Sequence, residues 1–182
     1  MTPIASPDRS GDTEDQDSSH LARPGPVAGA ALHGARLSAG VSQAVLAAAA
    51  GVSEDTIRSW EDGTSPLASV PLPQVESLEA ALGDSGADPR LIADLSAAAW
   101  CDLLIAAIIG NEDASCLLAD QLTSSDEFGE MLAWCLAGRV PFRHRAYAAR
   151  GSLLTDSILA ERVIKALDAV HPRLAAACRL AF

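Results

Sequence analysis

The chain of 182 residues has few aromatic residues and no excess of basic ones. Only 4% of its residues are aromatic, whereas 49% are hydrophobic, so its core must consist mainly of Ala, Leu, Val and Ile. Alanine is the best intrinsic helix former, which favours a helical core. The formal net charge of −11 argues against indiscriminate binding to nucleic acid or to anionic membranes. The charge is uneven, however, because residues 83–138 sum to −9 and residues 139–182 to +5.

The sequence also lacks paired cysteines and clustered catalytic side chains. Zinc ligation normally needs short, paired spacings, and none of the four cysteines lies in a CxxC or Cys/His cluster. Each stands among apolar neighbours, so we expect buried, reduced thiols. We find no Ser/His/Asp or Cys/His arrangement and no glycine-rich phosphate loop, and therefore expect no cofactor, no metal and no enzymatic activity. The cysteines are Cys101, Cys116, Cys135 and Cys178.

Targeting and membrane signals are equally sparse. The N-terminus lacks the basic start and apolar stretch of a signal peptide. The most apolar run, from Leu95 to Gly110, is too short to span a bilayer and contains Asp102. We expect a cytoplasmic protein that does not bind membranes.

Hydrophobic periodicity divides the chain into a tail and a helical remainder. Residues 1–26 are rich in Ser, Asp, Pro and Gly, which predicts a disordered acidic tail. From Val27 onward the pattern is helical, with no alternating run typical of a strand, so the fold class is all-α. The helices are expected at about 27–40, 43–50, 53–62, 74–83, 88–110, 113–122, 124–138 and 155–170, with a short one after Pro172.

The segment around Gly51 has the pattern of a helix-turn-helix. Gly51 supplies the positive φ that a sharp turn between two short helices requires. Apolar side chains on both sides of it can fill the junction: Leu46, Ala47, Ala50, Val52, Ile57 and Trp60. The other face of the following helix is polar: Glu54, Asp55, Arg58, Ser59 and Asp62.

Residues 27–83 resemble the lambda-repressor-like regulators of the Xre/Cro type. The residues that carry the resemblance are Arg36, Gly40, Ser42, Gln43, Leu46, Ala47, Gly51, Val52, Ser53, Thr56, Ile57, Trp60, Glu61 and Gly63. The resemblance implies a five-helix DNA-binding domain at 27–83 and a sequence-specific transcriptional regulator. Residues 84–182 are similar to the helical C-terminal extension of actinobacterial regulators. The implied partner is double-stranded operator DNA, bound by a homodimer.

The acidic residues near the turn call for an explanation in a DNA-binding segment. In the family the position of Glu61 pairs with that of Arg36, which implies a structural ion pair between the first and third helices. Glu54 and Asp55 lie in the first turn of the recognition helix, where acids stabilise the helix dipole by roughly 0.3–1 kcal/mol. They could instead accept hydrogen bonds from cytosine N4. We favour the dipole for Asp55 and leave Glu54 open.

The other candidate DNA contacts lie close to these acids. Arg58, one turn past Glu54, is the natural reader of a guanine, with Ser59 beside it. Ser53 caps the recognition helix at the same surface. Gln43 opens the second helix, where the family contacts a phosphate, although a solvated polar residue is also expected there.

Phosphate neutralisation requires more cations than this segment holds. Residues 29–82 contain only Arg36 and Arg58 as basic residues, yet affinity for DNA comes largely from phosphate contacts. A later segment, 138–151, combines arginines with Phe142, His144 and Tyr147 and no acid. It is either a phosphate-binding arm or a loop that neutralises the acidic segment 84–138. The candidate phosphate contacts are Arg139, Arg143, Arg145 and Arg150.

Two alternatives concern the partners. Ile158, Leu159, Val163 and Leu167 form an apolar stripe on one face of a helix. This stripe predicts self-association through the C-terminal half, unless it packs into the core of its own chain.

The alternative to DNA binding is a protein-interaction module of the same fold. Its acidic face would bind a basic protein such as a toxin, a sigma factor or another regulator.

Overall fold

The structure, a computed structural model, describes residues 25–110, 126–148, 153, 157–170 and 175–176. Within these ranges every regular element is a helix, which confirms the all-α fold class. Almost all of the expected acidic tail lies outside the described residues, as does the expected helix at 113–122. Cys116, Cys178 and Arg150 also lie outside them.

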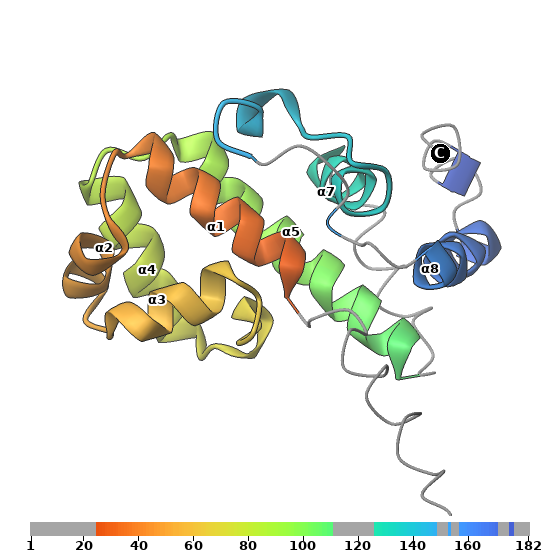
Figure 1. Cartoon of the computed structure of the whole chain (residues 1–182), viewed down its shortest axis with the longest axis horizontal. Coiled ribbons are helices and arrows are strands. Elements are labelled where there is room, and N and C mark those ends of the chain that lie inside the picture. The colour runs from red at the N-terminus through yellow and green to blue at the C-terminus, as the bar shows by residue number, and fades with distance from the viewer. Residues whose placement is uncertain (1–24, 111–125, 149–152, 154–156, 171–174, 177–182) are drawn as a thin grey trace, which may run out of the picture.

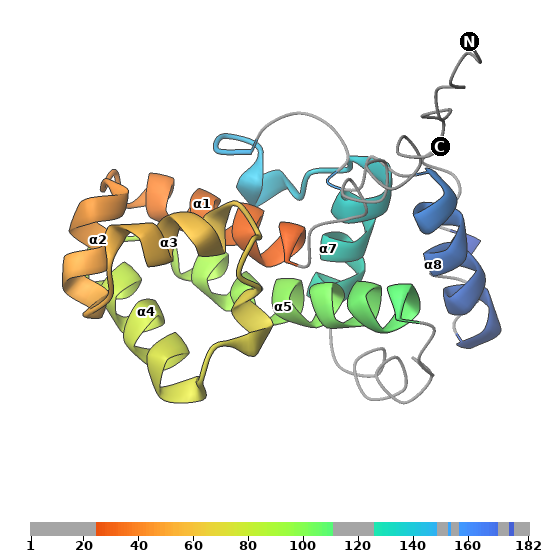
Figure 2. The same ribbon diagram turned by 60° about the horizontal axis from the view of Figure 1, so that its bottom comes forward.

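The first part of the chain forms five α-helices and one short 3-10 helix. They are α1 (Pro26–Ser38), α2 (Gln43–Ala50), α3 (Glu54–Glu61), η2 (Leu67–Ser69), α4 (Leu72–Asp84) and α5 (Pro89–Ile109). α2 and α3 pack against each other at one end, with α4 beside them (Figure 1). α5 makes its largest contact with α1 and continues beyond it (Figures 1 and 2).

Local sequence signals explain where these helices begin. The hydroxyl oxygens of Ser42 and Ser53 accept hydrogen bonds from the backbone N–H groups three residues later, at 3.2 and 3.1 Å. The Asp88 carboxylate caps α5 in the same manner by accepting from Arg90 N–H at 2.9 Å. α4 begins two residues earlier than expected, at Leu72, because Pro73 suits the first turn of a helix and does not terminate the loop.

The second part of the chain packs onto the far half of α5. It comprises α7 (Asp126–Ala137), η3 (Phe142–His144) and α8 (Ser157–Val170). α7 contacts α5 and α1, and α8 contacts α5. Val163 and Leu167 of α8 are fully buried inside the chain, whereas the side chains of Ile158 and Leu159 lie outside the described residues. The described half of the apolar stripe therefore packs into the chain's own core.

One hydrophobic core runs through the described residues, from Val27 in α1 to Ala175 near the C-terminus. Cys101 and Cys135 are buried in it. Among the described helices, α5 is long and apolar enough to cross a membrane by length and composition, but most of that stretch is buried inside the molecule. Its apolar character is accounted for by its central place in the core.

Asp102 interrupts the apolar sequence of α5 because it caps α1. Its two carboxylate oxygens accept hydrogen bonds from the backbone N–H groups of Val27 and Ala28, at 3.0 and 2.9 Å. The residue that precedes α1, Gly25, offers no side-chain cap, so the carboxylate takes over this role from 75 residues away. Burial raises the pKa of Asp102 to about 7, although the two N–H groups act to lower it.

We expect this cap to make stability depend on pH near neutrality. The folded-state pKa lies above the unfolded value of about 3.9, so the folded state binds the extra proton between these values. The wild type should therefore lose stability, by up to about 4 kcal/mol, relative to Asp102→Asn as pH rises from 4 to 8. Urea unfolding of both proteins across this range measures the difference. A difference that stays constant with pH would contradict the buried, proton-binding cap.

Candidate nucleic-acid interface

The junction between α2 and α3 is a tight turn closed by Gly51. This residue has φ +71°, the left-handed region that glycine adopts without steric cost. Val52 N–H donates to Ala47 C=O at 3.0 Å across the turn. The apolar side chains expected at the junction are buried, with Val52 partly so, and they hold the two eight-residue helices together: Leu46, Ala47, Ala50, Ile57 and Trp60.

The end of α3 lies directly against the backbone of α1. A Cβ atom on Gly29 would stand 2.5 Å from the carbonyl oxygen of Glu61 and 2.7 Å from that of Trp60. Both oxygens belong to the backbone and cannot move aside without displacing α3. Glycine at this position therefore sets the distance between α1 and α3.

An ion pair between Arg36 and Glu61 fixes the same two helices. Arg36 Nε lies 2.5 Å from Glu61 Oε1, and Arg36 Nη2 lies 2.9 Å from Oε2, a two-pronged contact. The third guanidinium nitrogen donates to the carbonyl oxygen of Val41 at 2.9 Å, in the turn before α2. Only 8% of the Arg36 side chain and 5% of the Glu61 side chain are exposed.

Glu61 is the centre of a wider polar cluster. Besides Arg36, its Oε2 lies 3.1 Å from His33 Nδ1 and accepts a hydrogen bond from Gln43 Nε2 at 2.8 Å. Burial alone would raise the pKa of Glu61, but the hydrogen bonds from His33, Arg36 and Gln43 and the charge of Arg36 lower it to about 2. The cluster joins α1, α2 and α3, and it turns the Glu61 carboxylate away from the exposed face of α3.

The exposed face of α3 consists of an arginine held by two acids. Arg58 Nη2 lies 3.0 Å from Glu54 Oε1, and Nη1 pairs with the Asp55 carboxylate. About half of the Arg58 side chain is exposed, so these are surface ion pairs, worth about 0–1 kcal/mol. Glu54 and Asp55 thus hold the Arg58 guanidinium at the surface of α3 through exposed ion pairs alone.

The hydroxyl groups of Ser53 and Ser59, both candidates for DNA contacts, form hydrogen bonds with Thr56 of the same helix. Ser53 Oγ accepts from Thr56 N–H and contacts Thr56 Oγ1 at 2.8 Å. Ser59 Oγ donates to the Thr56 carbonyl oxygen at 2.8 Å. Gln43 is half-buried, and its amide nitrogen is used by Glu61.

The comparison with protein families agrees with this geometry. Residues 28–91 match the family model of the helix-turn-helix domain. The chain contains a helix-turn-helix domain. No curated protein and no solved structure matches the chain. The matched range begins two residues inside α1, covers α2, α3 and α4 and ends in the first turn of α5, so the helix-turn-helix domain includes the Arg36–Glu61 pair and the exposed face of α3.

The basic segment that follows α7 and contains η3 packs on the side of α1 that faces away from α3 (Figure 1). In Figure 1, α1 lies between α3 and the η3 segment. Arg143 is bound by two carboxylates, those of Asp94 in α5 and Glu130 in α7. Arg143 therefore neutralises acids of the segment 84–138, the alternative to a phosphate contact. Arg139 is exposed, and Arg145 is exposed with its guanidinium 5.8 Å from the Phe142 ring.

Asp94 and His144 form a buried pair beneath this segment. His144 Nε2 lies 2.8 Å from Asp94 Oδ2, and the imidazole packs 4.9 Å from the Trp134 ring, centroid to centroid. Burial would raise the pKa of Asp94, but hydrogen bonds from His144 and Arg143, with their charges, lower it. Sequence reasoning assigned no role to Asp94. Among the described residues, no group of three or more His, Cys, Asp or Glu side chains is placed to hold a metal ion.

Proposed function

We propose that the protein is a sequence-specific DNA-binding transcriptional regulator of the Xre/Cro type, acting in the cytoplasm. The observation that carries this proposal is the polarity of α3. Its apolar side is buried by the helix-turn-helix core, and Glu61 is held inward by Arg36. Its outer side exposes Arg58 with the acids that position it.

Arg58 is the proposed base reader. A guanidinium on the exposed face of a recognition helix can donate to guanine O6 and N7 in the major groove. The exposed ion pairs with Glu54 and Asp55 are weak, so a guanine can replace them at small cost. Once released, the Glu54 carboxylate is free to accept from the N4 group of a neighbouring cytosine. The acids then act as a holding site for Arg58 in the unbound protein.

The shortage of cations supports binding as a homodimer. Of the two arginines in residues 29–82, Arg36 is committed to Glu61, which leaves Arg58 for DNA. Two linked domains that contact two half-sites gain affinity without new contacts in either domain. Sedimentation at tens of micromolar protein is expected to show a dimer, and a strict monomer would reject this part of the proposal.

We expect Arg58→Ala to weaken operator binding by about 1–3 kcal/mol and to relax the preference at one base position. The reason is the loss of a bidentate contact with a base edge. Arg145→Ala is the matched control, because Arg145 is also an exposed arginine but lies outside the helix-turn-helix domain. If Arg145 touches DNA, it touches phosphates, and its loss weakens all sequences alike and lowers the salt slope by about one.

Both variants are measured on operator and random DNA over a range of salt concentrations. Uniform weakening on all sequences by Arg58→Ala would remove this residue from base readout. Absence of DNA binding by the unmodified protein would leave the interaction module with a basic protein partner as the surviving interpretation.

A further inference from the structure

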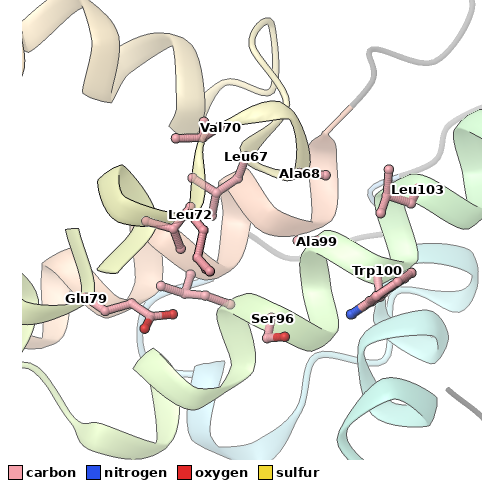
Figure 3. A pocket seen from close by; sticks show the side chains of 11 residues that line it. Leu67, Ala68, Val70, Leu72, Glu79, Ser96, Ala99, Trp100 and Leu103 are labelled. Atoms are coloured by element: carbon pink, nitrogen blue, oxygen red, sulfur yellow. The ribbon is translucent and has the colours of Figure 1, made fainter. Parts of the chain in front are cut away.

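A cavity lies on the side of the molecule where η2, α4 and α5 meet (Figure 3). Its volume is about 290 Å³, close to the lower end of the range for small-molecule sites, about 300–1,000 Å³. Apolar side chains from all three elements line most of it. They include Leu67, Val70, Leu72, Ala99, Trp100 and Leu103.

The lining has a single ionisable group, Glu79 of α4. In Figure 3 its carboxylate lies at one end of the cavity, and Trp100 and Leu103 lie at the other, with Ser96 between them. No hydrogen bond or ion pair to the Glu79 carboxylate occurs within the described part of the chain. No Lys or Arg is among the residues that line the cavity, and the charge that acts on Glu79, that of Glu76, is also negative.

We infer that this cavity binds a small amphipathic cation, with an ammonium group at Glu79 and a hydrocarbon body against Trp100 and Leu103. Charge complementarity selects this class of ligand, because one partly buried carboxylate without a counter-ion faces an otherwise apolar space. Burial and the nearby Glu76 raise the pKa of Glu79, and a bound cation would relieve both effects. A second copy of this acidic chain, net charge −11, is a poor counter-ion for the same carboxylate.

The position of the cavity connects it to the recognition helix. η2, which supplies Leu67, follows α3 after a short loop that is bonded back to α3 through Ser65 N–H and the Ser59 carbonyl oxygen, at 3.0 Å. A ligand against Leu67 therefore contacts the segment that leaves the DNA-reading helix. This consequence, a change in DNA affinity on ligand binding, rests on the proposed function, whereas cation binding does not.

The test uses hexylammonium, hexanol and hexanoate as probes of equal chain length and different charge. Binding to the full chain is followed by chemical shifts of the Trp100 indole N–H, assigned with Trp100→Phe. We expect hexylammonium to bind about tenfold or more tightly than the other two, because it gains a charge-assisted hydrogen bond. Equal binding of all three probes, or no binding of hexylammonium, would overturn the proposal.

Three variants locate the site. Glu79→Gln should reduce hexylammonium affinity to that of hexanol, whereas Glu76→Gln, which removes the neighbouring charge but does not line the cavity, should preserve the preference. Ala99→Phe should fill the cavity and abolish binding of all probes, and an unchanged circular dichroism spectrum of this variant shows that it is folded. An ammonium preference that survives Glu79→Gln would contradict the assignment.

DNA binding is measured separately without probes, so a failure there rejects the proposed function and leaves the cation site standing.

Discussion

Replacing Arg36 by alanine is expected to destabilise the protein by roughly 3–5 kcal/mol. The substitution leaves the Glu61 carboxylate buried without its cation, and it also removes the donor to the Val41 carbonyl oxygen. For a chain of this size each kcal/mol lowers the melting temperature by roughly 2–4 °C. Thermal and urea unfolding measure the loss, and unchanged stability would show that the pair does not tie α1 to α3.

The pH dependence of the same variant provides an independent check. Glu61 has a folded-state pKa of about 2, below its ordinary value of 4.5. Its contribution to stability is therefore complete above the ordinary value and is lost as pH falls through the folded value. The wild type should lose roughly 3 kcal/mol from this group between pH 4.5 and 2, and Arg36→Ala should lose much less. Parallel pH profiles for the two proteins would contradict the pairing.

Replacing Asp94 by alanine is expected to have an effect of similar size, roughly 3–5 kcal/mol. Asp94 is 1% exposed and accepts hydrogen bonds from both Arg143 and His144, so its loss leaves the buried imidazole without its partner and the half-buried guanidinium with only the exposed Glu130. His144 also packs on Trp134, so the tryptophan fluorescence should change as the segment loosens.

Glu130→Gln is the matched control for this prediction. Glu130 pairs with the same arginine, but half of its side chain is exposed, and such pairs contribute at most about 1 kcal/mol. An Asp94→Ala variant no less stable than Glu130→Gln would mean that the buried carboxylate does not anchor the basic segment.

The features that could be predicted from the sequence are those that depend on neighbouring residues. Ser42, Ser53 and Asp88 cap helices three or fewer residues away, and Gly51 sets the turn between α2 and α3. The spacing of Glu54 and Asp55 from Arg58, four and three residues, also predicts the ion pairs within one helix that the structure shows beside the helix dipole.

The features that could not be predicted join residues far apart in the chain. Asp102 meets the first turn of α1 from 75 residues away, and Asp94 meets Arg143 from 49 residues away. Neither partner follows from local periodicity. The sequence did contain one indication of these contacts. Asp94 and Asp102 stand eight residues apart in a largely apolar helix, and a carboxylate buried among apolar side chains needs a hydrogen-bonding or charged partner.

The basic segment illustrates the same limit for function. Composition alone left two roles for Arg143, a phosphate contact or neutralisation of acids, since arginine forms two-pronged contacts with both phosphates and carboxylates. The packing of η3 against α5 decides which carboxylates it meets. Charge counts along a sequence cannot supply that packing.

The central claim, that the exposed face of α3 reads a DNA sequence, is tested most directly by selection from random duplex DNA with the unmodified protein. We predict enrichment of one sequence, arranged as two symmetric half-sites about one helical turn apart. Selection without enrichment of any sequence, even at low salt, would contradict the claim.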